Sequence, residues 1–182
     1  MGCDIHFFTE RLTTDNNYQG PKDVSEEREN KLNEILINED PKERWVSADE
    51  WVREKDWDSD DEDKLTWEVP YGSNYYNGRN YYLFSILADV RNYGEEIAPI
   101  DYPRGIPEDA STGYKFQVDR WAGDGHSHSY FTLEELLNVD WETYNNSLGA
   151  DGYLNQFLDV IEKMKEIDSD PSKVRCVFFF DN

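Results

Sequence analysis

The sequence predicts an α+β fold: a single domain over residues 1–182, with a central mixed sheet that includes the N- and C-terminal strands and several packed helices. Apolar and polar side chains alternate from residue 2 to residue 10, which is typical of a strand with one buried face. Residues 174–180 form an apolar run too short for a helix, which indicates a central strand buried on both faces. Between these ends, several segments place apolar residues at helical spacing.

The N-terminal strand presents two different faces. Successive side chains of a strand point to opposite sides, so one face carries Cys3, Ile5, Phe7 and Thr9, and the other carries Asp4, His6, Phe8 and Glu10. We expect the first face to meet the core. We expect the face with Asp4 and His6 to line a site, beside the C-terminal strand.

Residues 21–63 are expected to form an acidic peripheral insertion, in which acidic residues far outnumber basic ones. An amphipathic helix is predicted over 24–37, and short strands over 44–47 and 65–69. The acidic run at 58–63 resembles a calcium loop only superficially. It lacks the glycine at the sixth position and the glutamate at the twelfth, so an exposed acidic loop is favoured.

The middle of the chain is predicted to hold a core helix over 79–91 and a proline-fixed loop over 103–107. This loop presents Arg104 from a stiff backbone, which suits an anion or phosphate contact. The alternative is a surface arginine paired with one of the many carboxylates. A short strand is predicted over 113–118.

The second half of the chain holds the segment Asp124-Gly-His126-Ser-His128-Ser, which is expected in a loop or strand end. Thr132 and Glu135 have the spacing of a capping box, which predicts a helix that opens there and runs to about residue 138. A second helix is predicted over 151–167, with an apolar stripe toward the core.

The net charge of −22 argues against direct nucleic-acid binding and against an anionic membrane surface, because both need a basic face. It permits cation binding, or mimicry of a nucleic acid toward a basic partner. No apolar run approaches the length of a membrane span, and no signal peptide is visible. With two cysteines, Cys3 and Cys176, no disulfide framework is expected, and a cytoplasmic setting fits best.

All three histidines of the chain lie in two short clusters, Asp4-Ile-His6 and His126-Ser-His128. Side chains two residues apart on an extended segment point the same way, so each cluster is expected to present two ligands from one face. Imidazole nitrogen and carboxylate oxygen suit zinc, manganese or iron. The sequence therefore predicts a divalent metal site formed by Asp4, His6, His126 and His128.

Other side chains are candidates for roles around that metal. Asp124 would orient a ligand or act as a general base, and Trp121 and Tyr130 would contact a substrate. A second arrangement uses Cys3, Ser127 or Ser129 as a nucleophile with a histidine as its base. Conventional phosphate-binding motifs such as G-x-x-x-x-G-K-[ST] are absent from the sequence.

Two resemblances bear on the function. Asp4-Ile-His6 and Gly125-His-Ser-His128 are similar to the first and last metal motifs of calcineurin-like metallophosphoesterases, although the middle motifs of that family, Gly-Asp-x-x-Asp and Gly-Asn-His, are missing. The chain also resembles small uncharacterised proteins of phages and prophages that begin Met-Gly-Cys-Asp-Ile-His. The matching pieces are residues 1–6, 82–92, 103–107, 124–129 and 174–182. This resemblance implies a phage-associated protein in the host cytoplasm, without an established activity.

The leading hypothesis is a metal-dependent hydrolase of a phosphate ester or nucleotide, such as a nucleotide signal of host defence. The metal would activate a water, Asp124 and His126 would act in catalysis, and Arg104 would hold the phosphate and stabilise developing charge. The first alternative is a protein that binds and sequesters a nucleotide messenger without turnover. The second is an acidic mimic of nucleic acid that inhibits a host protein through residues 21–63.

Overall fold

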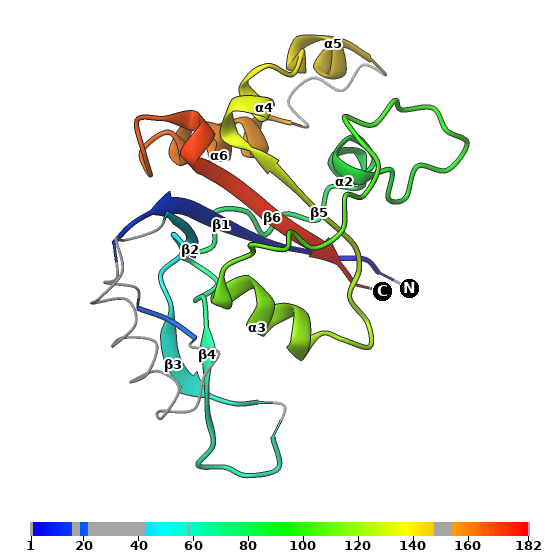
Figure 1. Cartoon of the computed structure of the whole chain (residues 1–182). Coiled ribbons are helices and arrows are strands. Elements are labelled where there is room, and N and C mark those ends of the chain that lie inside the picture. Colours follow the sequence, from blue (N-terminus) through cyan, green and yellow to red (C-terminus); the bar gives the residue numbers. More distant parts are fainter. Residues whose placement is uncertain (1, 16–18, 22–42, 58, 148–153, 182) are drawn as a thin grey trace.

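The main sheet of the protein has four strands in the order β2-β1-β6-β5. In this computed structural model, which describes residues 2–15, 19–21, 43–57, 59–147 and 154–181, the strands are β1 (Ile5–Thr13), β2 (Arg44–Ser47), β5 (His126–Thr132) and β6 (Val174–Phe180). The α+β class and the pairing of the two terminal strands are confirmed (Figure 1). Each of the three strand pairs is antiparallel, so the expectation of a mixed sheet is wrong.

Strand β6 occupies the centre of the sheet, between β1 and β5. All seven of its residues are buried, as the apolar run predicted. The register places Phe7 opposite Phe178 and His6 opposite Phe179. Since opposite residues share a face, Phe178 and Phe180 point to one side of the sheet, and Phe179 points to the other with His6.

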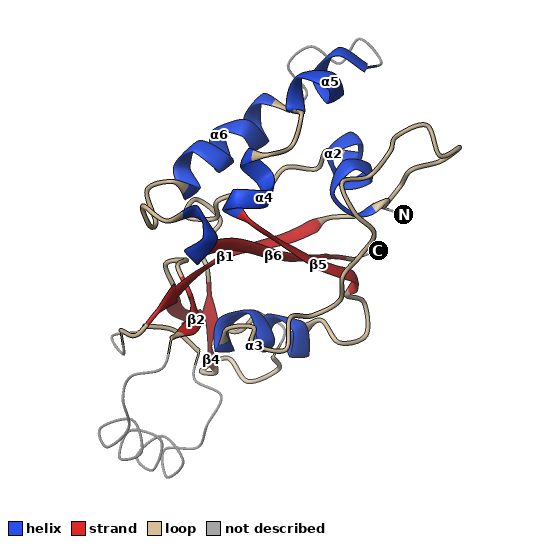
Figure 2. Ribbon diagram, turned by 45° about the horizontal axis from the view of Figure 1, so that its top comes forward, coloured by secondary structure: helices blue, strands red, loops and turns tan. Residues whose placement is uncertain are grey.

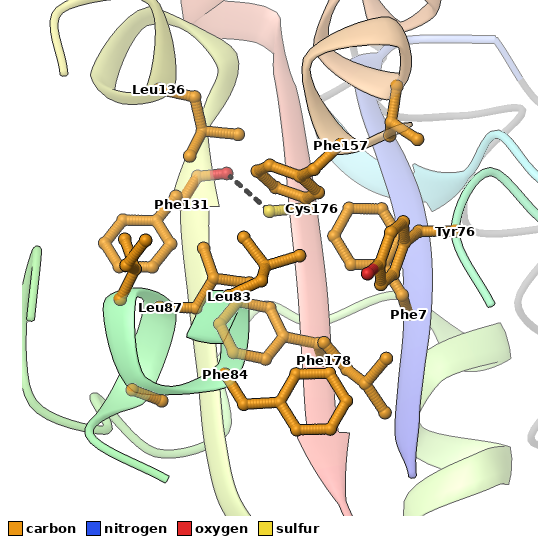
Figure 3. Close-up of a cluster of buried hydrophobic side chains, with 14 of the residues drawn as sticks. Phe7, Tyr76, Leu83, Phe84, Leu87, Phe131, Leu136, Phe157, Cys176 and Phe178 are labelled. Atoms are coloured by element: carbon orange, nitrogen blue, oxygen red, sulfur yellow. Dashed lines mark hydrogen bonds between the residues drawn. The ribbon is translucent and has the colours of Figure 1, made fainter. Parts of the chain in front are cut away.

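Three helices cover the first side of the sheet: α2 (Tyr81–Ala88), α4 (Leu133–Leu137) and α6 (Asn155–Met164) (Figure 2). Phe84 of α2 packs its ring against Phe180, with 4.9 Å between the centroids. Figure 3 shows how rings and aliphatic side chains fill this core, with the Cys176 thiol donating to the carbonyl of Phe131 at 3.6 Å. We call this side the helical face; its core is almost wholly apolar.

The opposite side of the sheet is covered by α3 (Thr112–Arg120), which Figure 2 shows below it. We call it the α3 face. Its smaller core includes Phe8, Tyr114, Val177 and Phe179. A separate two-stranded hairpin, β3 (Val52–Lys55) and β4 (Leu65–Glu68), extends away from the sheet on this side (Figure 1). The short elements α5 (Trp141–Asn146) and η2 (Pro171–Lys173) complete the described secondary structure.

A buried ion pair also lies on the α3 face. Glu10 of β1 and Arg175 of β6 face each other in the register, and Arg175 Nε donates to Glu10 at 2.5 Å. Arg175 also donates to Asp109 at 2.9 Å and stacks over the ring of Trp45. The second carboxylate oxygen of Glu10 accepts from the backbone N–H of Ser111. Both charged side chains therefore have ion-pair and hydrogen-bond partners, which offset the cost of burying them.

Most expected elements are present with shifted ends, but one is wrong. The segment 113–118, predicted as a strand, belongs to helix α3, because Ser111 caps it by accepting from the backbone N–H of Tyr114. The capping box of Thr132 and Glu135 is confirmed, with both of its hydrogen bonds formed. The helix expected over 24–37 lies outside the described residues. Within the described part of the chain, no helix has the length and apolar character needed to span a membrane.

Candidate functional site

His6 lies between two aromatic rings on the α3 face. Its imidazole stacks on Phe179 of β6, with ring centroids 4.6 Å apart, and meets Trp121, just after α3, at 4.3 Å. Strand pairing fixes Phe179, and the end of α3 fixes Trp121. The imidazole is therefore held by packing on both sides, as expected for a preorganised functional group.

One nitrogen of His6 is hydrogen-bonded to a carboxylate. His6 Nε2 lies 3.1 Å from Asp181 Oδ2, and the other oxygen of Asp181 accepts from the backbone N–H of Asp4 at 2.8 Å. A carboxylate only accepts, so Nε2 carries the proton and the lone pair resides on Nδ1. Burial lowers the pKa of His6, against the opposing effect of Asp181. The imidazole is thus neutral at pH 7 and able to accept a proton.

Asp4 is paired with Arg79 rather than standing as an open ligand. Arg79 Nε donates to Asp4 at 2.6 Å, and a second guanidinium nitrogen donates to the other carboxylate oxygen. This bidentate contact lowers the pKa of Asp4. Both side chains are about half exposed, at 54% for Arg79 and 48% for Asp4, so an incoming anion can compete for the guanidinium.

The surface beside His6 is hollowed into two cavities, of about 670 and 180 Å³, that share His6, Asn74 and Trp121. We call them together the His6 groove. The larger cavity carries a ring, amides, an arginine and two carboxylates: Tyr71, Asn74, Asn77, Gln156, Arg79, Asp4 and Asp181. Gly78 lies tightly in its wall, because an added Cβ would lie 2.7 Å from the hydroxyl of Tyr76. The groove offers aromatic faces, amide donors and acceptors, a cation and a proton acceptor.

The two histidines of β5 do not share a face, although their spacing predicted that they would. Ser127 has a φ of 50°, in the left-handed region, and the register between β5 and β6 shifts between His126 and Ser129. This bulge adds one residue opposite Phe179, so the alternation is interrupted. His126 consequently packs against Phe180 on the helical face, and His128 against Phe179 on the α3 face.

The four predicted metal ligands are therefore not assembled into one centre. His126 and His128 lie on opposite faces of the sheet. His128 Nδ1 is hydrogen-bonded to the hydroxyl of Tyr114 at 3.1 Å, and Asp4 is held by Arg79. Among the described residues, no group of three or more His, Cys, Asp or Glu side chains is arranged to hold a metal ion. As arranged here, the predicted set does not fit one divalent metal.

The other predicted site residues lie in separate places. Arg104 donates to Asp101 and Glu135, both at 2.9 Å, and to the carbonyl of Tyr130. It is thus paired with carboxylates, as the alternative prediction for this residue stated, and these contacts hold its loop in place. The ring of Tyr130 packs at the edge of the α3-face core. Asp124 is exposed and lines a different cavity from that of Asp181. Trp121 lines the His6 groove.

The nucleophile alternatives are buried or engaged. The Cys3 side chain is buried, and burial raises the pKa of its thiol. The hydroxyl of Ser129 is buried and accepts from the backbone N–H of Arg104. The Ser127 hydroxyl lies 3.0 Å from His126 Nδ1, so this serine does contact a histidine, as the nucleophile alternative expects.

Sequence reasoning missed Asp181, Arg79 and Gln156 as groove residues. Asp181 had a visible signal, since it directly follows the apolar run of β6 beside the strand that carries His6. Arg79 and Gln156 had none, because they reach the groove from segments distant in sequence, Arg79 from the loop before α2 and Gln156 from α6. Comparison with known protein families, curated proteins and solved structures gives no match for this chain.

Proposed function

We propose that this protein binds a nucleotide or a related phosphate ester in the His6 groove and hydrolyses its phosphate-ester bond. The observation that carries the proposal is the pair formed by His6 and Asp181, in a neutral and fixed tautomer, at the wall of a groove with an aromatic ring and an arginine. A histidine oriented by a carboxylate is a common general base. The setting we propose is the cytoplasm of a phage-infected host.

Substrate recognition follows from the chemistry of the groove. Trp121 and the exposed Tyr71 offer rings on which a nucleobase stacks. The amides of Asn74, Asn77 and Gln156 offer both donors and acceptors for base edges or sugar hydroxyls. Arg79 is the arginine of the larger cavity and would hold the phosphate, since its guanidinium fits two phosphate oxygens as it now fits Asp4.

The proposed step needs only a water molecule besides the ester. His6 Nδ1 accepts a proton from water as the water oxygen forms a bond to phosphorus, while Asp181 stabilises the imidazolium that results. The bond from phosphorus to the leaving oxygen breaks, and the proton passes from His6 to that oxygen. Arg79 balances the negative charge that develops on the phosphoryl oxygens.

Turnover of simple phosphate esters tests this proposal. The assay would use p-nitrophenyl phosphate, bis(p-nitrophenyl) phosphate and cyclic and linear nucleotides, with and without EDTA. We expect hydrolysis that persists in EDTA, falls about 100-fold or more in His6→Gln, and falls less in Asp181→Asn. Asp159→Asn, an equal change at an exposed position of α6, is the matched control and should behave as wild type.

The same assay examines the metal hypothesis. Hydrolysis that disappears in EDTA, returns with zinc or manganese, and is lost in His126→Gln would show that the two faces cooperate around a metal in another conformation. That result would contradict the mechanism proposed for His6 and Asp181.

The second candidate function is sequestration of a nucleotide without turnover. It is favoured by one observation: the groove supplies rings and amides that would bind a nucleotide without any chemical step. Tight nucleotide binding by calorimetry, weakened in Trp121→Ala, with unchanged ligand after long incubation, would establish sequestration in place of hydrolysis.

A further inference from the structure

A second hollow lies between the β3–β4 hairpin and the end of α3, with a volume of about 730 Å³. We call it the hairpin cavity. It is lined by the rings of Trp67, Phe116 and Trp121 and by the carboxylates of Asp119 and Asp124. It contains neither His6 nor Asp181, and its acidic character sets it apart from the part of the groove that holds Arg79.

The electrostatics of the hairpin cavity favour a cation. Asp56 is already neutralised by Lys64 at 3.0 Å and by Arg120. Asp119 and Asp124 are exposed and form no ion pair with any described residue. The cavity also lies at the C-terminal end of α3, where the helix dipole is negative. The whole chain, with a net charge of −22, adds to this local field.

The aromatic walls suit a cation of one kind, a guanidinium or ammonium group. Such groups bind over the faces of tryptophan rings, most strongly where water is partly excluded. The hairpin already shows this contact within the chain. The guanidinium of Arg53 lies 5.7 Å from the centroid of the Trp67 ring, and Lys55 lies 4.9 Å from that of Trp57.

Exposed apolar side chains next to the cavity point to a macromolecular partner. Trp57 is 77% exposed and Leu65 is 51% exposed, on a hairpin that extends away from the main sheet (Figure 1). Large exposed rings beside charged groups are typical of protein interfaces, whose central residues are often tryptophan and arginine. A small polyamine would leave these two side chains in water.

We propose that the hairpin cavity docks a basic segment of a partner protein, with an arginine side chain between the rings of Trp67, Phe116 and Trp121. Asp119 and Asp124 pair with its guanidinium, and Trp57 and Leu65 contact the flanking residues. The hairpin cavity adjoins the His6 groove, because Trp121 lines both, but Asp119 and Asp124 do not line the groove. Its acidic field speeds the encounter with a basic partner, and the rings supply the short-range contact.

Binding of a defined basic peptide tests this docking surface. The probe is a fluorescein-labelled peptide of alternating arginine and glycine, measured by fluorescence anisotropy with the full chain. We expect the double variant D119N/D124N to bind it about 10-fold more weakly. The matched control is E134Q/E142Q, which removes the same charge from exposed positions on α4 and α5 and should change affinity less than about 2-fold.

Two further arms make the outcome decisive. A peptide with citrulline in place of arginine keeps the shape but not the charge, and it should not bind. Equal weakening by the two double variants would show general attraction to an acidic protein and would overturn the proposal. Displacement of the peptide by spermine, added so that it supplies the same concentration of positive charges as the peptide, would also overturn the proposal. The cavity would then be a site for a small polyamine.

Discussion

The two faces of the central sheet are built from the same apolar strand but differ in what they enclose. On the helical face, Phe178 and Phe180 meet a largely apolar core of rings and aliphatic side chains, and Phe180 also contacts His126. On the α3 face, Phe179 meets His6 and His128, and farther along the same strand Arg175 pairs with Glu10. Neighbouring residues of one strand therefore meet an apolar core on one side and polar, titratable side chains on the other.

The difference follows from what covers each face. The three helices on the first face bury apolar side chains, so few polar groups enter this core. The Nε2 of His126 is a buried nitrogen on this face that has no hydrogen-bond partner among the described residues. The single helix α3 leaves the end of the second face open, and a hydrogen-bonded imidazole can lie there beside a groove. The bulge at Ser127 then decides which face each β5 histidine joins.

The largest effect on stability is expected from truncation in the helical face. Phe84→Ala removes a fully buried ring that packs against Phe180, and it should lower the free energy of unfolding by about 4 kcal/mol. Chemical denaturation would measure this loss. Nucleotide affinity of the protein that remains folded should be unchanged, and a large loss of affinity would show that the two faces are not separate.

Removal of the buried cation on the α3 face should have the next largest effect. Arg175→Met leaves Glu10 buried without its ion partner, and we expect a loss of about 3 kcal/mol in the free energy of unfolding. Replacing both residues, as Glu10→Leu with Arg175→Met, should recover much of this stability. A loss in the double variant equal to the sum of the losses in Glu10→Leu and Arg175→Met would mean that the pair contributes no coupling.

A methyl group at the start of β5 should have a smaller effect. In Gly125→Ala the added Cβ would lie 3.1 Å from the carbonyl oxygen of Trp121 and 3.2 Å from the Phe179 ring. The crowding should lower the free energy of unfolding by about 2 kcal/mol and displace the ring that supports His6. The midpoint temperature of thermal denaturation and the nucleotide affinity would both decrease. A loss of stability with unchanged nucleotide affinity would show that Gly125 does not affect the His6 groove.

The smallest effect concerns pH. Burial lowers the pKa of His6 in the folded state, so the folded protein resists its protonation. The neutral His6 therefore contributes fully to stability above pH 6.5, the approximate pKa of a histidine in the unfolded chain. This contribution is lost as the pH falls through the lower pKa that His6 has in the folded protein. The hydrolysis rate should fall over that same range below pH 6.5. A hydrolysis rate that instead rises with pH above 6.5 would show that a group other than His6 is the general base.

The sequence predicted the fold where local pattern and burial agree. The apolar run predicts strand β6 and the capping box predicts helix α4, because both patterns are formed by residues close together in the sequence. Residues 113–118 predict a strand but belong to helix α3, whose apolar stripe is weak and whose start is marked by the Ser111 cap. The site was predicted less well. A single positive φ at Ser127 separates His126 from His128, and spacing alone does not reveal that bulge.

The separation of the two faces can be tested with the three histidines themselves, since each imidazole reports from a known side of the sheet. Protein labelled with ¹⁵N-histidine would be titrated with a nucleotide, and the ring signals assigned with His→Gln variants. We predict that the His6 signals shift, with its Nε2 protonated and Nδ1 unprotonated in the free protein, while those of His126 do not. Shifts at His126 with an unchanged His6 would contradict the account.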